Sequence, residues 1–279
     1  MRRAALAGVA LLVVLSGCSG DSGDSDADSD ADPTGSPSPS TSTSAAPAKA
    51  APFPKKDACY RLTFEQAVAP TAEDDSVGCR TSHTAQTFHV GRLDTVVDGH
   101  LLAVDSAYVR NQPVRECPRR LATYLGTTPS ELRLSMLQAV WFTPTVAASD
   151  AGEDWYRCDV IALATGGRLA PLRGQLARAL ASPAGRARYG VCARTEPGTR
   201  NFRRVICTPA TAWRAISTVN LRGRDYPGQK AVQAAGQSPC EDVARRQADD
   251  PLSFTWGYEW PTKQQWDAGQ RYGVCWMQR

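Results

Sequence analysis

The sequence predicts an α+β protein made of two tandem small disulfide-stapled domains, each with a few antiparallel strands and one main helix. A fifteen-residue frame, PT-x4-DAG-x5-C, occurs at residues 144–158 and again at residues 261–275. Eight cysteines form two sets of four, with gaps of 20, 38 and 41 residues and then of 15, 33 and 35 residues. Such matched spacing indicates one unit duplicated in tandem, with length changes in its loops. The first repeat is assigned to residues 55–162, a connecting loop and helix (the connector) to 163–187, and the second repeat to 188–279.

The N-terminus predicts export and a lipid anchor. Arg2 and Arg3 precede a twelve-residue apolar run, residues 4–15, which is too short to span a bilayer. A basic start, a short apolar core and small residues before a cut form a secretion signal. Its end, Leu-Ser-Gly before Cys18, resembles the bacterial lipobox, whose cysteine is lipidated. We expect residues 1–18 to be a lipoprotein signal peptide and Cys18 to hold the protein at the extracytoplasmic face of the cell membrane; an ordinary signal peptide is the alternative.

Residues 19–54 are predicted to be a disordered tether rich in Asp, Ser, Pro and Thr. Residues 19–52 contain no aromatic and no long aliphatic side chain, so they cannot bury enough apolar surface to fold. From residue 53 onward, 29 Lys and Arg stand against 22 Asp and Glu, a net charge of +7. A mildly basic domain outside the cell favours anionic wall polymers or lipid headgroups as partners, and nucleic acid is not expected there.

The eight cysteines after Cys18 predict structural disulfides. An even set in an exported chain is typical of disulfides, and no Cys-x-x-Cys spacing indicates a zinc or redox site. If the disulfides form within each repeat and both repeats share one pairing pattern, three connectivities remain possible. We favour a bond between the first and second cysteines of each repeat and another between the third and fourth. The interval between the first two cysteines predicts a hairpin, and the interval between the last two predicts a helix tied to a strand. The favoured pairs are Cys59–Cys79, Cys117–Cys158, Cys192–Cys207 and Cys240–Cys275.

The predicted elements follow the same order in both repeats. Strand-like runs at residues 57–64 and 86–90 predict a hairpin, as do residues 189–194 and 202–207. A helix follows at residues 115–126, ending on a glycine of the kind that terminates helices. In the second repeat, Ser238-Pro-Cys-Glu241 fits a capping box and predicts a helix start.

After the helix, two further segments are predicted. Alternating Leu132, Leu134 and Met136 indicate a strand that reaches residues 140–142, and the DAG of the repeated frame predicts a turn before the last strand. In the connector, an Arg-rich amphipathic helix is expected around residues 172–180. Packing on a domain is favoured for it, with a membrane-lying helix as the alternative.

Several of these motifs together resemble a known family. They are Cys79-x3-His83, the stretch from Cys117 to Tyr124-Leu-Gly126, Pro171-Leu-Arg-Gly174, and the second frame with Trp266 and Gly269. The combination resembles the septum-formation domain of exported and membrane-tethered proteins of high-GC Gram-positive bacteria. Two departures stand out, because Ser149 replaces Trp266 in the first repeat and Thr211 replaces His83 in the second. The resemblance implies a cell-envelope role near division or wall growth and no known reaction.

The residues themselves offer little for catalysis. All three histidines lie in the first repeat, no Ser or Cys nucleophile motif is present, and adjacent acids such as Glu153-Asp154 are typical of solvated turns. His83 and His89 are six residues apart and would ligate a metal only if a carboxylate joined them. We therefore predict no catalytic residue, no cofactor and no metal.

The sequence as a whole favours a noncatalytic exported lipoprotein that acts as a binding module in septum formation. Its expected partners are the membrane, through the lipid anchor, and envelope or division proteins or anionic wall polymer. Possible recognition residues are His83, Trp260 and Trp266, and an arginine patch between residues 200 and 224 would meet an anionic polymer. A cell-wall-modifying hydrolase and a metal- or small-ligand-binding lipoprotein are the alternatives.

Overall fold

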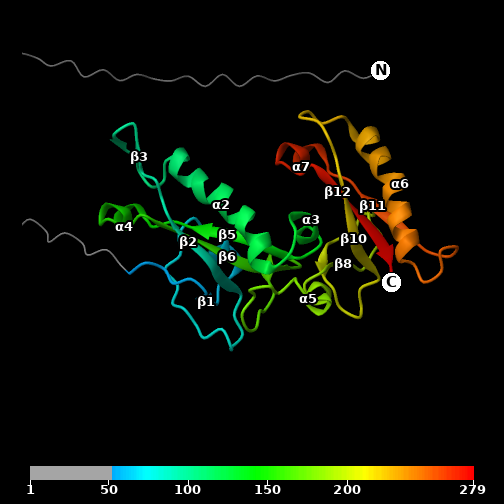
Figure 1. The fold of residues 1–279 in the computed structure, drawn as a ribbon, viewed down its shortest axis with the longest axis horizontal. Coiled ribbons are helices and arrows are strands. Elements are labelled where there is room, and N and C mark those ends of the chain that lie inside the picture. Colours follow the sequence, from blue (N-terminus) through cyan, green and yellow to red (C-terminus); the bar gives the residue numbers. More distant parts are fainter. Residues whose placement is uncertain (1–51) are drawn as a thin grey trace, which may run out of the picture. The chain divides into compact units, whose positions relative to one another are not determined.

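A computed structural model describes residues 52–279 (Figure 1). The predicted signal peptide, Cys18 and tether residues 19–51 lie outside these residues. The described chain forms two five-stranded sheets, each accompanied by one long helix, so the predicted α+β class with tandem domains is confirmed. In the described part of the chain, no helix has the length and apolar character needed to cross a membrane.

The first sheet has the strand order β1-β2-β6-β5, all antiparallel, and β7 pairs with the far end of β6. A separate two-stranded ribbon, β3 with β4, precedes the long helix α2. The elements are β1 (Cys59–Tyr60), α1 (Phe64–Ala67), β2 (Ala85–Arg92), β3 (Val96–Val97), β4 (His100–Leu101), α2 (Ala107–Leu125), α3 (Pro129–Leu132), β5 (Leu137–Phe142), α4 (Val146–Asp150), β6 (Trp155–Ala164) and β7 (Arg168–Leu169).

The second sheet repeats this plan with the order β11-β12-β10-β8-β9. β11, β12, β10 and β8 correspond to β5, β6, β2 and β1, and α6 corresponds to α2. The elements are α5 (Pro183–Arg188), β8 (Val191–Ala193), β9 (Val205–Ile206), β10 (Trp213–Asn220), α6 (Gln229–Gln247), β11 (Trp256–Glu259), α7 (Lys263–Asp267) and β12 (Tyr272–Gln278).

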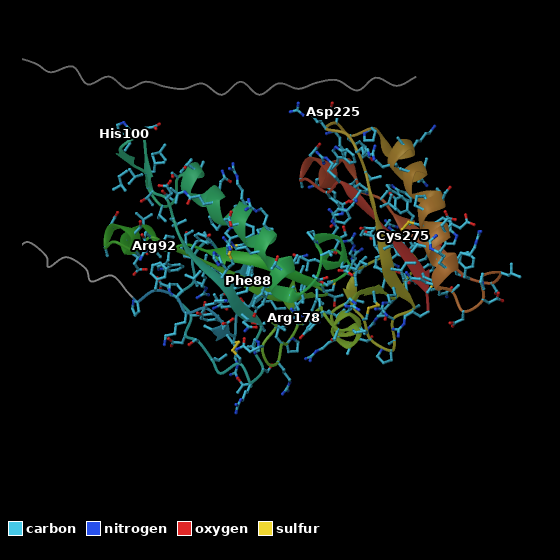
Figure 2. All side chains as sticks on the ribbon, in the orientation of Figure 1. Phe88, Arg92, His100, Arg178, Asp225 and Cys275 are labelled. Carbon is cyan, nitrogen blue, oxygen red and sulfur yellow. A yellow bond between two sulfur atoms is a disulfide. The ribbon has the colours of Figure 1, made fainter. Side chains whose placement is uncertain are left out.

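Four disulfides staple the two repeats, and they join the pairs favoured from the sequence (Figure 2). In each repeat one bond closes the first hairpin. The other ties the long helix to the last strand, α2 to β6 through Cys117–Cys158 and α6 to β12 through Cys240–Cys275. All four of these helix and strand cysteines are at most 1 % exposed, so the bonds cross the cores.

The connector and the second repeat complete the packing of the first. Leu172, Leu176 and Leu180 are buried in the cluster that fills the space between α2 and its sheet. Backbone hydrogen bonds from Met136 N to Tyr189 O (2.8 Å) and from Val191 to Leu134 join the repeats. The burial of apolar area here stabilises both repeats together.

The predicted helix starts were wrong. α2 begins at Ala107, capped by Ser106, and α6 begins at Gln229, so Ser238-Pro239 lies inside α6 rather than at its start. The buried positions of α6, Val232, Gly236, Cys240 and Ala244, recur every four residues across the proline. This continuous buried stripe holds the helix together where the local signal indicated a start. The predicted end at Gly126 is correct, because this residue has φ +70° and caps α2.

The connector helix around residues 172–180 is also absent. Leu172 exchanges two backbone hydrogen bonds with His83, at 3.2 and 2.7 Å, and Gly174 and Arg178 have φ values of +73° and +59°. These positions cannot close helical hydrogen bonds, and the helix that does form is α5, after Ser182. The strand expected from Leu132 starts only at Leu137, because Leu132 ends the capped helix α3.

The repeated frame forms a capped helical turn rather than a simple turn. Thr145 and Thr262 are the N-caps of α4 and α7, and each side chain accepts a hydrogen bond from the backbone three residues on. Gly152 and Gly269 then adopt φ +98° and +96°, a left-handed conformation that favours glycine. The residues that both copies of the frame share are therefore the ones that determine this backbone conformation.

Candidate functional site

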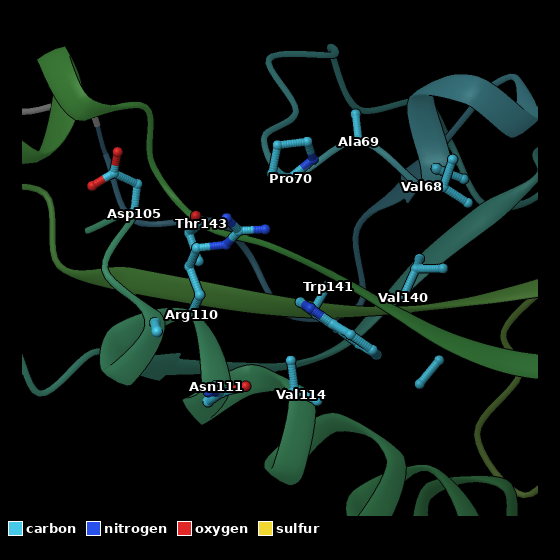
Figure 3. Close-up of a pocket in the computed structure, with 13 residues that line it drawn as sticks. Val68, Ala69, Pro70, Asp105, Arg110, Asn111, Val114, Val140, Trp141 and Thr143 are labelled. Atoms are coloured by element: carbon cyan, nitrogen blue, oxygen red, sulfur yellow. The ribbon is translucent and has the colours of Figure 1, made fainter. Parts of the chain in front are cut away.

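A groove opens on the first repeat, with a volume of about 630 Å³ (Figure 3). Three segments line it: residues 67–70 at the end of α1 and just after it, residues 105–114 around the start of α2, and residues 139–143 at the end of β5. Its walls are mostly apolar.

The floor of the groove is the outer edge of β5, which among the described strands pairs with β6 alone. Thr143, the first residue after the strand, donates its N–H to Pro70 O (3.0 Å) on this open side. Because alternate residues of an antiparallel strand direct their backbone groups to the same edge, Ala139 and Trp141 face the open side as well. In the described part of the chain, no hydrogen bond reaches their outward backbone groups. The groove thus presents a short strand edge ready for pairing.

Apolar side chains stand on both sides of this edge. The Trp141 indole lies toward Val114 of α2, whereas Val140 points toward Val68 (Figure 3). Trp141 and Val140 are half-buried, and Val68 and Val114 are 58 % and 40 % exposed. A strand laid along β5 would place its alternate side chains against these two walls.

The charged rim of the groove is small. Asp105 and Arg110, both exposed, lie at one end, beside Thr143 (Figure 3). Asp105 is the single carboxylate that lines the groove. An acid/base pair for glycoside cleavage needs two carboxyls at one cleft, and the described lining of this groove supplies one.

In the second repeat an aromatic ring fills the corresponding space. Tyr258 stands 117 residues after Trp141 and, like it, lies opposite the last cysteine of its repeat. Its ring is buried against Gly236 of α6 and Gly273 of β12, where an added Cβ would lie 2.0 and 2.3 Å from ring atoms. Its hydroxyl donates to Val232 O on α6 (3.2 Å), and burial raises its pKa to about 12.

One exchanged residue explains why the first repeat stays open. It has Tyr156 where the second repeat has Gly273, and the Tyr156 ring packs on Gly91 of β2, where an added Cβ would lie 2.4 Å from the ring. The Tyr258 ring lies over β12 because Gly273 has no side chain there. In the first repeat the Tyr156 side chain stands at that position of β6, so the Trp141 ring has no room to lie over β6. Trp141 is therefore left at the groove.

Exposed apolar side chains gather on the same repeat. Of eight large hydrophobic residues that are exposed in the described chain, seven lie between residues 53 and 146. They are Phe53, Val68, Val96, Leu101, Tyr108, Val114 and Val146. Two of them, Val68 and Val114, line the groove.

A buried ion pair lies behind the groove floor. Asp159 of β6 is the cross-strand partner of Val140, is fully buried, and accepts a hydrogen bond from the Thr87 hydroxyl (2.7 Å). Arg157 Nε lies 3.3 Å from Asp159 Oδ2, and its guanidinium is stacked between the rings of Tyr60 and Phe142, at 4.0 and 4.7 Å. Burial raises the pKa of Asp159 to about 6, against the opposing effect of Arg157.

The histidine and tryptophans predicted for recognition are not in the groove. His83 is fully buried, with Nδ1 3.0 Å from Thr81 O, and its counterpart Thr211 likewise bonds within the turn after the second cysteine. Trp266 is 1 % exposed and donates Nε1–H to Arg224 O (3.0 Å), so it packs in the core of the second repeat. Trp260 is half-buried beside Tyr258.

Metal ligation finds no support in the described residues, where no three His, Cys, Asp or Glu side chains converge. His89 lies on β2 and contacts the Tyr156 ring and hydroxyl instead. Sequence reasoning missed Trp141 as a site residue. The available signal was the exchange of Tyr156 for Gly273, each two positions before the last cysteine of its repeat, which predicts different aromatic packing in the two repeats.

Comparison with known proteins gives one match. A protein-family model described as septum formation matches residues 29–145 and again residues 138–275. The double match confirms the tandem repeat. No curated protein and no solved structure was found to match the chain.

Proposed function

The chain belongs to the septum formation family, and from this membership we propose that it is a noncatalytic, membrane-anchored lipoprotein of the cell envelope that binds another division or envelope protein. The binding site is the groove of the first repeat. The second repeat contributes the scaffold that completes the packing of the first. The observation that carries the proposal is the open edge of β5 between two apolar walls.

The proposed occupant is an extended segment of the partner protein. The outward N–H and C=O groups of Ala139 and Trp141 match the backbone of an added strand, and a sugar or phosphate polymer offers no such repeating pair. The walls select small or apolar side chains at alternate positions. Asp105 and Arg110 favour a charged or polar residue where the segment leaves the groove.

The anchor and tether are part of the same proposal. Residues 19–54 would have an average span of about 30 to 35 Å if fully flexible, so the repeats would act clear of the membrane surface. A partner that inserts a strand into the groove would then be held near the site of anchoring. Weak binding is sufficient in that arrangement, because anchoring raises the effective concentration.

The lipid anchor gives a direct prediction. Cys18→Ala is expected to move the protein from the membrane fraction to the soluble fraction and to remove the lipid mass from its N-terminus. Cell fractionation and mass spectrometry measure both, with Ser19→Ala as the matched control. Retention of Cys18→Ala in the membrane at the level of the unaltered protein would refute the anchor.

A proline substitution on β5 tests whether the groove binds its partner through backbone hydrogen bonds. Ala139→Pro removes the outward N–H while leaving the ladder to β6, and edge strands tolerate proline at such positions. A photoreactive residue at position 68 is expected to crosslink a partner in dividing cells, and Ala139→Pro should abolish the adduct. Val146→Ala, an exposed apolar change outside the groove, should not. An adduct that survives Ala139→Pro, or one formed with a second copy of this chain, contradicts the proposed occupant.

A further inference from the structure

A second pocket, of about 680 Å³, lies between the start of the connector and the first hairpin of the second repeat (the arginine pocket). Residues 164–171 line one side, and residues from 194 to 211 line the other. Three guanidiniums line it, those of Arg168, Arg194 and Arg203, and no Asp or Glu does. The site is separate from the groove and does not depend on its function.

The three arginines are available for a ligand. None of them forms an ion pair with any described residue. Arg168 Nε donates to Thr165 O (3.4 Å) and Arg203 donates one N–H to Phe202 O (2.7 Å), which leaves most of their donors free. A concentration of like charge without a counter-ion favours an anionic ligand.

The rest of the lining narrows the ligand class. Four threonines and Asn201 add hydroxyl and amide groups, and Leu169, Val205 and Ile206 add apolar surface between the charges. Guanidiniums bind phosphate in a bidentate manner, and the apolar stretches suit the carbon chain between two phosphates.

From this lining we infer that the arginine pocket binds a phosphodiester-linked polyol polymer, by its phosphates on Arg168, Arg194 and Arg203. Thr208 and Thr211 form the fixed side of the pocket, since the Arg279 guanidinium donates to Thr208 O at 3.1 Å and lies 3.5 Å from Thr211 Oγ1. The first-repeat groove and this pocket would then hold two different partners, one a protein and one a polymer.

The test uses the full chain and a synthetic glycerol-phosphate oligomer in a calorimetric titration. The triple change Arg168→Gln, Arg194→Gln and Arg203→Gln is expected to weaken binding about ten-fold or more. The matched control, Arg80→Gln, Arg115→Gln and Arg222→Gln, removes the same charge from exposed arginines that line neither pocket, and it should weaken binding far less.

Three results would overturn the inference. The first is that the unaltered chain does not bind the oligomer. The second is that both triple variants lose the same amount of affinity for the oligomer, which would indicate general charge attraction. The third comes from vesicles containing phosphatidylglycerol: pocket-dependent binding to vesicles without binding to the soluble oligomer would assign the pocket to lipid headgroups. Circular dichroism of each variant checks that the fold is retained.

Discussion

Replacing Asp159 with alanine is expected to lower the free energy of unfolding by about 3 to 5 kcal/mol. The change leaves the Arg157 guanidinium, whose side chain is 4 % exposed, without its counter-ion between the Tyr60 and Phe142 rings. Urea denaturation followed by tryptophan fluorescence measures the loss.

A double replacement separates the lost charge from the lost packing. The second repeat has Val274 and Trp276 at the positions of Arg157 and Asp159, so an apolar pair is compatible with this fold. Arg157→Met with Asp159→Val should come within about 2 kcal/mol of the unaltered protein. A double variant as unstable as Asp159→Ala would show that packing, not the unpaired charge, explains the loss.

The same carboxyl gives a pH dependence of defined sign. Burial raises the Asp159 pKa from 3.8 to about 6, so the folded protein holds this proton more tightly than the unfolded chain does. Its contribution therefore makes the free energy of unfolding fall as the pH rises from about 4 to about 6. Asp159→Asn should lack this component of the pH profile, and an unchanged profile would contradict the assignment.

Removing the Cys117–Cys158 disulfide is expected to destabilise the protein by about 4 kcal/mol. The bond closes a 41-residue separation and ties α2 to β6, with both cysteines fully buried. Alanine at both positions also removes packing from the main core cluster. Chemical denaturation under non-reducing conditions measures the change.

The first hairpin supplies the matched control for that result. Cys59–Cys79 closes only 20 residues, and its loss should cost about 3 kcal/mol by the same loop-entropy relation. Cys79 is half-buried, so less packing is lost there. A larger effect for Cys59–Cys79 than for Cys117–Cys158 would show that the helix-to-strand bond is not the main staple.

Spacing and periodicity predicted much of the fold, because cysteines and turn residues constrain the backbone locally. Cysteines pair with one another, and glycines adopt backbone conformations that other residues avoid. These two residue types predicted the duplication, the four disulfide pairs and the end of α2 at Gly126. The predicted elements at Ser238-Pro239 and residues 172–180 failed for the opposite reason. There, buried contacts across the sheet and the bonds of Leu172 to His83 override the local signal.

The candidate site could not be predicted from motif residues. His83 and Trp266, the residues that carry the family resemblance, are buried and maintain the turn and the core. The groove arises from a difference between the repeats, Tyr156 against Gly273, and only the packed structure shows that this difference leaves Trp141 at an open strand edge. The family motifs thus preserve the scaffold, and the site depends on where the repeats diverge.

The most direct test of the proposed groove is amide hydrogen exchange with the partner segment identified by crosslinking, synthesised as a peptide. Binding is predicted to slow exchange at Ala139 and Trp141 about ten-fold or more, because an added strand would bond their outward groups. Trp256 and Tyr258, at the same positions of the second repeat, should be unchanged. Unchanged exchange at Ala139 and Trp141, or protection confined to the second repeat, would contradict strand addition in the groove.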